Sequence, residues 1–301
     1  MTILVTGTIP KALKPGIETF WGEYSEEDMV AAQLVAMETS DEAFVENVLI
    51  SPFGLLETKN EGSSVAYDNM TQGYSSRYNQ RTKALGFQVS WEARKFNKYL
   101  DVVAKGNKFL ARSAKETKEI DVAQLFNRGF TAGITFGDGK TLFATDHPTR
   151  SGTFSNKLAT PADLSEAALE DLSIQIRTAT DDRGLSIGLR PELVAVHPNQ
   201  MFEIQRILYS DLRVDTANND LNALKKSNMF PKGFVVNEHF TSTDAFFIKT
   251  NAPEGAKMIT AVQGEFSNDG DFNTADHKYK FMTSYAIGID DPRGYYASEG
   301  V

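Results

Sequence analysis

The sequence predicts an α+β fold. Strand-like and helix-like segments are mixed along its 301 residues and do not alternate regularly, which argues against a parallel α/β sheet. Hydrophobic residues make up 41% of the chain, an ordinary globular share that excludes a disordered or collagen-like protein. Cysteine is absent, so disulfides, thiolate metal sites and cysteine nucleophiles are excluded as well.

The N-terminal region is predicted to be an arm. Proline and glycine interrupt any regular pattern there, and a polar run then precedes a short helix expected over residues 29–37. We therefore expect residues 1–41 to lie outside the core. The apolar stretch after Met1 is too short for a signal-peptide core, and no apolar run is long enough to cross a membrane.

Residues 42–92 show the pattern of a strand followed by an extended hairpin. Apolar residues over 44–50 predict one strand, and alternation predicts two more around residues 65–67 and 87–91. Residues 69–84 hold almost no aliphatic side chains, and a loop of that length in a compact domain is uncommon unless it has a function. Because tyrosine and arginine are enriched where proteins meet, we expect this loop to bind a neighbouring molecule; a disordered surface loop is the alternative. The candidate contact residues are Tyr74, Arg77, Tyr78, Arg81 and Lys83.

Helical periodicity dominates residues 93–128. The apolar spacing predicts two helices separated at Gly106, of which the second is about 20 residues long and ends at Gly129. Further along the chain, Asp163 is followed three residues later by Glu166, which predicts the N-cap of another helix.

The other segments after residue 129 are predicted to be mostly turns and strands. A Gly-Asp-Gly turn at residues 137–139 predicts a hairpin over 130–150. Apolar runs predict several strands and one helix, and a polar stretch at 216–222 predicts a loop. The strands are expected at 193–196, 234–237, 245–250, 257–266 and 279–289, and the helix at 199–210.

Charge is distributed unevenly along the chain. The net charge of −9 argues against a main surface that grips nucleic acid. Residues 1–70 hold 3 basic and 12 acidic residues, whereas residues 71–128 hold 12 basic and 5 acidic residues. Chance and solvated faces explain such a distribution. The alternative is electrostatic complementarity between copies of the chain, which favours correct partners and fast encounter.

Two loops resemble ligand sites only in part. Gly137-Asp-Gly-Lys-Thr141 has Ile134 where a phosphate-binding loop requires glycine. Asp269-Gly-Asp-Phe-Asn273 has Thr274 and Lys280 where a calcium loop requires glycine and glutamate. We therefore predict neither a nucleotide site nor a calcium site.

Asp146, His147 and Ser151 have the residue types of a hydrolase triad. Adjacent residues of a strand point to opposite faces, so Asp146 is not placed to orient His147, and the Gly-x-Ser-x-Gly motif is missing. The histidines show no spacing typical of metal ligands. The residues alone therefore predict a protein that is not an enzyme and has no catalytic, cofactor-binding or metal site. An enzyme with a dispersed site is the alternative.

A series of short motifs follows in order along residues 85–300. These are Gly137-Asp-Gly-Lys-Thr-Leu-Phe-Ala-Thr-Asp-His-Pro148, Ser155-Asn156, Leu164-Ser-Glu-Ala-Ala-Leu169, Asp182-Arg-Gly-Leu185, Pro191-Glu-Leu-Val-Ala-Val-His-Pro198, Ala217-Asn-Asn-Asp-Leu-Asn222, Asp271-Phe-Asn-Thr274, Tyr285-Ala-Ile-Gly288 and Asp291-Pro-Arg-Gly-Tyr295. In order and spacing they resemble the major capsid proteins of tailed phages, specifically the Mu-like major head subunit group with the Hong Kong 97-type fold. The first 60 residues match poorly.

The resemblance implies a shell subunit that has an arm, an extended loop, a peripheral domain with a long spine helix, and an axial domain. The implied boundaries are 1–41 for the N-terminal arm, 42–92 for the strand and extended loop, 93–162 for the peripheral domain with the spine helix, 163–254 for the axial domain, and 255–301 for the return strands and C-terminal tail. In this arrangement the extended loop folds over the next subunit.

The implied function is that of a major capsid protein, which self-assembles through pentamers and hexamers into an icosahedral shell around double-stranded DNA. Implied partners are copies of itself, portal and scaffold proteins, and DNA bound without sequence specificity, with no membrane and no cofactor. The implied location is the virion, after assembly in the host bacterial cytoplasm. Reversing Arg77, Arg81 and Lys83 to glutamate is expected to prevent particle formation and leave the subunit folded. A nanocompartment shell of the encapsulin type, which holds a cargo enzyme, is the alternative.

Overall fold

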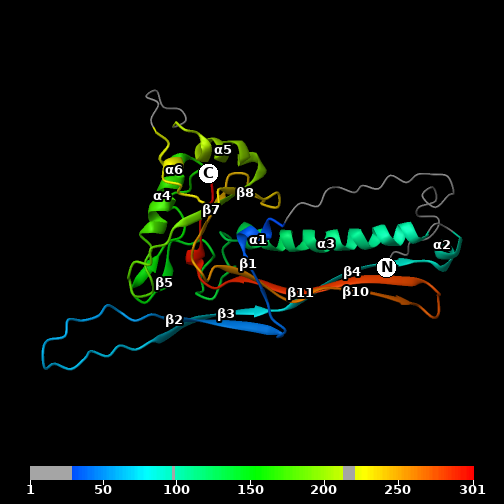
Figure 1. Ribbon diagram of the computed structural model, residues 1–301, viewed down its shortest axis with the longest axis horizontal. Helices are drawn as coiled ribbons and strands as arrows, with labels where there is room; N and C mark the ends of the chain where they lie inside the picture. Colours follow the sequence, from blue (N-terminus) through cyan, green and yellow to red (C-terminus); the bar gives the residue numbers. More distant parts are fainter. Residues whose placement is uncertain (1–28, 97–98, 213–220) are drawn as a thin grey trace.

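Two four-stranded sheets organise the chain. Figure 1 shows the computed structural model. The structure describes residues 29–96, 99–212 and 221–301. The first sheet has the strand order β1-β10-β11-β4, and the second has the order β12-β9-β7-β8. The mixture of helices and strands confirms the predicted α+β class.

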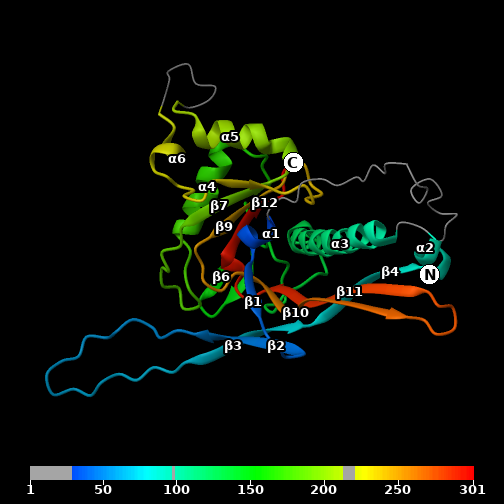
Figure 2. The same ribbon diagram turned by 45° about the vertical axis from the view of Figure 1, so that its right-hand side comes forward.

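The first sheet is long, and one helix lies along it (Figures 1 and 2). Its strands are β1 (Ala36–Thr39), β10 (Ala256–Gly270), β11 (His277–Ile289) and β4 (Arg81–Val89). The helix is α3 (Tyr99–Asn127), a single element that contradicts the predicted break at Gly106. A Cβ at Gly106 would lie 2.8 Å from the ring of Phe87, so the glycine lets the helix approach the sheet closely rather than ending it.

The second sheet is buried on both faces. It contains β7 (Pro191–Val196), β8 (Phe234–Val236), β9 (Phe246–Thr250) and β12 (Tyr295–Ser298). Side chains along a strand alternate between faces, so Leu193 and Ala195 enter the core shared with α3, while Val194 and Val196 enter a second core. The helices α4 (Glu166–Arg177), α5 (Met201–Tyr209) and α6 (Ala223–Lys226) supply that second core.

Residues 29–41 belong to the body, although the sequence assigned them to an arm. The helix expected over 29–37 is only α1 (Ala31–Leu34), because β1 pairs in parallel with β10 immediately afterwards. Ala31 and Leu34 are fully buried, and the Ala31 N–H donates to the carboxylate of Glu119 at 3.0 Å. The rest of the predicted arm, residues 1–28, lies outside the described residues.

The region 42–92 contains a hairpin, and its strands agree only in part with the apolar pattern: the strand predicted at 65–67 is absent, and the one predicted at 87–91 is the end of the longer β4. β2 (Phe44–Ser51) confirms the first predicted strand, and it pairs antiparallel with β3 (Thr71–Asn79). The stretch predicted as a loop is therefore mostly strand, and residues 52–70 have no strand at all. The polar composition of β3 reflects exposure of its side chains, since backbone pairing does not require aliphatic residues. At the end of β4 the chain turns into α2 (Trp91–Phe96).

Two further predictions need correction. The Gly-Asp-Gly turn exists, with Gly139 at φ +79°, but its flanks form no hairpin; the paired strands are β5 (His147–Thr149) and β6 (Gly152–Phe154). Ser165, not Asp163, caps α4 by accepting the Ala168 N–H at 3.2 Å. Asp163 instead accepts the N–H of the C-terminal residue Val301.

The other predicted elements are confirmed to within a few residues, including the strands of the second sheet and the long β10–β11 pair. The predicted helix over 199–210 consists of the short 3-10 turn η1 (Pro198–Gln200) and α5, and a second such turn, η2 (Pro292–Gly294), precedes β12. Most of the loop predicted at 216–222 lies outside the described residues. None of the helices in the described ranges is both long and apolar enough to cross a membrane.

Candidate functional site

The β2–β3 hairpin projects from one end of the molecule, and residues 52–70 extend beyond its strands (Figure 1). We call residues 52–70 the hairpin loop. Its large apolar side chains are exposed: Leu55 has 79% of its surface accessible and Tyr67 has 94%. Exposed apolar side chains gathered on one element are typical of a protein-binding surface. An isolated two-stranded hairpin is marginally stable in water, so this element gains most from packing on a partner.

Asp290, at the end of β11, anchors the base of the hairpin. Its carboxylate accepts hydrogen bonds from Tyr78 Oη at 2.6 Å and Asn47 Nδ2 at 2.7 Å, and its carbonyl accepts one from Tyr74 Oη at 2.9 Å. Lys257 Nζ lies 3.2 Å from the same carboxylate. Burial, together with the bond to Asp290, raises the pKa of the Tyr78 hydroxyl above its usual range, so Tyr78 stays a hydrogen-bond donor.

A second anchor holds the ends of the hairpin loop. Arg183 donates to the Asp68 carboxylate at 2.5 Å and to the Asn69 carbonyl at 2.7 Å. The Gly54 N–H also donates to Asp68, at 2.9 Å, so one carboxylate ties together both ends of the loop. The Gly54 N–H, the Arg183 guanidinium and the Asn69 N–H lower the pKa of Asp68 to about 2.

The five residues proposed from the sequence divide into two groups. Tyr74 and Tyr78 turn toward the body and bond to Asp290, so they position the hairpin within its own chain. The second group contains the cations. Arg77 lies over the Phe44 ring, 4.0 Å from its centroid, Arg81 is exposed at the start of β4, and Lys83 pairs with Asp121. These residues come together at the base of the hairpin; a contact between any of them and a neighbouring subunit stays a prediction.

The cations line a cleft of about 510 Å³ between the hairpin base, β4 and the C-terminal part of α3. We call it the basic cleft, defined by Arg77, Arg81, Lys83 and Arg128. Asp121 is the only acidic residue that lines it within the described ranges, and that carboxylate already binds Lys83 and Tyr285 Oη. Sequence reasoning missed Arg128. This residue follows the end of α3, and the helical pattern does not show that it faces the same cleft as the cations of β3 and β4.

Asp146, His147 and Ser151, which have the residue types of a hydrolase triad, do not form a triad in the structure. His147 Nδ1 pairs with Asp138 at 2.5 Å and its Nε2 lies 3.0 Å from Asn156 Oδ1, while Asp146 pairs with Lys140. Asn156 also donates to the carbonyls of Leu142, Pro292 and Tyr295. His147, Asp138 and Asn156 are almost completely buried, so this network joins chain segments and offers no nucleophile to a substrate.

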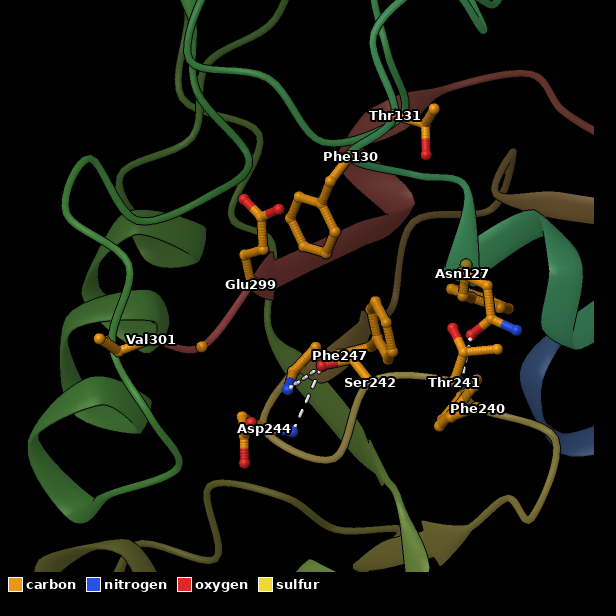
Figure 3. A pocket seen from close by; sticks show the side chains of 13 residues that line it. Asn127, Phe130, Thr131, Phe240, Thr241, Ser242, Asp244, Phe247, Glu299 and Val301 are labelled. Atoms are coloured by element: carbon orange, nitrogen blue, oxygen red, sulfur yellow. Dashed lines mark hydrogen bonds between the residues drawn. The ribbon is translucent and has the colours of Figure 1, made fainter.

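A pocket of about 480 Å³ lies between the end of α3, the loop before β9 and the C-terminus (Figure 3). Phe130 and Phe247 form its aromatic wall, and Glu299 and Asp244 supply carboxylates. Its other polar groups are engaged in local structure: Ser242 Oγ accepts the N–H of Ala245, and Asn127 bonds to the backbone of neighbouring loops. In the part of the chain that the structure describes, no group of three histidine, aspartate or glutamate side chains could hold a metal ion.

Comparisons with known proteins agree with this picture. A family model described as phage capsid protein matches residues 73–298. No curated protein matches the chain. Among solved structures, the chain is similar to the capsid of the Myoviridae phage XM1 (TM-score 0.57, 13% identity, 96% of this chain and 100% of that chain covered). It is also similar to the capsid of a native GTA particle (0.58, 8%, 96% and 96%) and to a chain of Mycobacterium phage Che8 (0.51, 14%, 96% and 100%). At these identities the structural matches establish a shared fold.

Proposed function

The chain belongs to the phage capsid protein family and is a major capsid protein of a tailed phage, and from this premise we propose how its copies build the head shell. The copies associate through pentamers and hexamers into a closed icosahedral shell. Each contact between neighbours is heterologous, meaning that two different surfaces meet, and such contacts close into rings. Many modest contacts per subunit then give a stable shell through multivalency.

The proposed division of the subunit follows the Hong Kong 97-type arrangement. The β2–β3 hairpin with its loop is the extended loop, and α3 is the spine helix. The sheet β1-β10-β11-β4 belongs to the peripheral domain. The sheet β12-β9-β7-β8 with α4, α5 and α6 corresponds to the axial domain, although β12 comes from the C-terminal end of the chain.

The observation that carries the proposal is the hairpin itself. It projects from the body, exposes apolar side chains along the hairpin loop, and is held by polar anchors at its base and at the ends of the hairpin loop. An element that is firmly attached but lacks a core of its own is suited to lie over a neighbouring copy. Burying its apolar side chains there contributes about 25 cal/mol for each Å² removed from water.

The remaining partners belong to the same proposal. Portal and scaffold proteins take part in assembly in the host bacterial cytoplasm, and the finished shell encloses double-stranded DNA in the virion. The net charge of −9 suits a container that confines DNA without binding it tightly. An encapsulin-type nanocompartment is not favoured, because the family match is to phage capsids.

Electron microscopy and sedimentation velocity of the purified full chain test the proposal. We expect closed particles for the unaltered chain. We expect the double variant Leu55→Ser with Leu56→Ser to remain as unassembled subunits or small rings, because it removes apolar contact area from the hairpin loop. Lys59→Ser changes the same loop without removing a large apolar side chain and should still assemble. Chains that stay strictly monomeric at every concentration and salt would contradict the proposal.

A further inference from the structure

The basic cleft concentrates positive charge that the described residues do not neutralise. Arg81 and Arg128 are exposed, and no carboxylate of residues 29–96, 99–212 or 221–301 lies within ion-pair distance of either. Lys83 is paired with Asp121, which is itself shared with Tyr285. A cleft lined by one sign of charge attracts a ligand of the opposite sign.

The apolar walls of the cleft set a second requirement for a ligand, in addition to negative charge. Leu125, Ile134, Phe136 and Ile287 line it beside the arginines. Guanidinium groups stack on aromatic rings as well as binding carboxylates, as Arg77 already does on Phe44. The best occupant therefore combines several carboxylates with aromatic or aliphatic side chains, which is the composition of an acidic peptide segment.

The chain contains one such segment immediately before the described body. Residues 18–28 hold five carboxylates, three aromatic residues and no basic residue. The acidic residues are Glu18, Glu23, Glu26, Glu27 and Asp28, and the aromatic residues are Phe20, Trp21 and Tyr24. We propose that residues 18–28 of one copy bind the basic cleft of a neighbouring copy. This inference rests on the proposed self-assembly and identifies the two surfaces of one contact.

The position of the two surfaces favours a neighbouring copy over the same copy. The segment leads into α1 and then β1, which is one edge strand of the long sheet. The cleft lies at the opposite edge, where β4 contributes Arg81 and Lys83. α3 lies over the strands between these two edges (Figure 2). With the binding segment at one edge of the sheet and the cleft at the other, each copy can bind the next in a head-to-tail contact that repeats from copy to copy.

Cysteine cross-linking tests the contact directly, because the natural chain has no cysteine. Arg81→Cys is combined in turn with Glu23→Cys, Glu26→Cys and Glu27→Cys in the full chain, and assembled material is oxidised and separated on non-reducing gels. We expect at least one pair to give dimers and higher multiples that disappear on reduction. The matched control pairs Glu26→Cys with Lys226→Cys, on α6 and away from the cleft, and should give none.

Other outcomes overturn the proposal. A fast-migrating monomer band, which indicates a disulfide within one chain, assigns the segment to its own cleft. Particles without any cross-link show that the segment does not occupy the cleft. Electron microscopy of the unaltered chain in the same experiment tests assembly separately, so failure of the proposed function is distinguished from failure of this contact.

A charge exchange provides a test that needs no disulfide. Arg81→Glu with Arg128→Glu should lower the yield of particles about tenfold, and adding Glu23→Arg, Glu26→Arg and Glu27→Arg should restore it. Lys83 is left unaltered. The sequence alone suggested that its reversal leaves the subunit folded, but the structure corrects this, because a glutamate there would lie beside Asp121 and disturb the fold. Lys226→Glu with Arg177→Glu makes the same change in net charge elsewhere and should assemble normally. The proposal would be contradicted if the three added arginines did not restore the particle yield. It would also be contradicted if the two arginine reversals left the particle yield unchanged and instead abolished the retention of added duplex DNA.

Discussion

The second sheet and the β2–β3 hairpin are built from the same kind of backbone pairing but differ in what surrounds them. In the sheet, strands such as β12 bury every residue between two hydrophobic cores. In the hairpin, β2 and β3 leave most of their side chains at least partly exposed. The sheet is buried on both faces within one chain, whereas the hairpin is attached through polar contacts and one small apolar cluster, in which Tyr78 and Val45 pack against Ile259 and Ala286. Most of the buried apolar area therefore lies in the first region, and the second is the region that we propose binds a neighbouring copy.

Truncation of a buried side chain should reveal the largest difference between the core of the body and the hairpin loop, measured as a loss of unfolding free energy. Phe126 is fully buried and contacts the rings of Phe240, Phe247 and Tyr295, so Phe126→Ala should lower the free energy of unfolding by about 3–5 kcal/mol. Leu56→Ala in the hairpin loop should change it by less than about 0.5 kcal/mol. Denaturant unfolding of the unassembled chain measures both values, and equal losses would show that the hairpin loop is packed in the free subunit.

Loss of a buried polar residue should have the next largest effect. Asn156 is fully buried and bonds to Ala144, His147 and three carbonyls, so Asn156→Ala should cost about 2–4 kcal/mol by leaving those groups without partners. Asn79 in the hairpin is exposed and accepts one bond from Arg77, so Asn79→Ala should cost less than about 1 kcal/mol. The same unfolding experiment compares them. A much smaller loss of unfolding free energy for Asn156→Ala would mean that water takes over the hydrogen bonds of the Asn156 side chain.

Weakening the anchor should loosen the hairpin and spare the sheet. Asp290→Asn removes the charge shared by Tyr78, Asn47 and Lys257, so amide hydrogen exchange in β2 and β3 should accelerate about tenfold. Exchange in β7 should stay unchanged. Tyr74→Phe removes only a bond to the Asp290 carbonyl and should have a smaller effect. Uniform acceleration throughout the chain would indicate that hairpin and body unfold as one unit.

The smallest expected effect is a pH dependence confined to the hairpin loop. The pKa of Asp68 is lowered to about 2, below its unfolded value, so its stabilising contribution is fully present above about pH 4. That contribution is lost as the pH falls through about 2. Carboxyl carbon-13 NMR should show the low pKa directly, and Arg183→Gln should move it back toward the ordinary value. An unshifted titration in the unaltered chain would show that the Asp68–Arg183 pair is absent in solution.

Much of the fold was predictable where burial leaves a strong pattern. The strands of the second sheet, the helix that contains α5, and the long β10–β11 pair were all expected from apolar runs. Errors arose where the pattern was weak or had another cause. β3 is polar because it is exposed, so it was predicted as a loop, and Gly106 was interpreted as a helix end when it accommodates the ring of Phe87.

The candidate site was predictable in part. The cluster of tyrosines and cations in residues 74–83 directed attention to the hairpin base, and its role in subunit contact stays a prediction. The sequence could not separate Tyr74 and Tyr78, which bond to Asp290, from Arg77 and Arg81, which line the cleft. It also could not add Arg128 or Asp290, because they are far along the chain and only folding brings them there.

By itself, the sequence determined the α+β class, the order of motifs typical of phage capsid proteins, and the contrast between an acidic N-terminal part and a basic middle. These properties are readable because periodicity, motif spacing and charge are local quantities. The tertiary structure alone decided which polar side chains are used within the chain and which face outward. That decision depends on contacts between residues more than 200 positions apart, such as Tyr78 with Asp290, which no local pattern encodes.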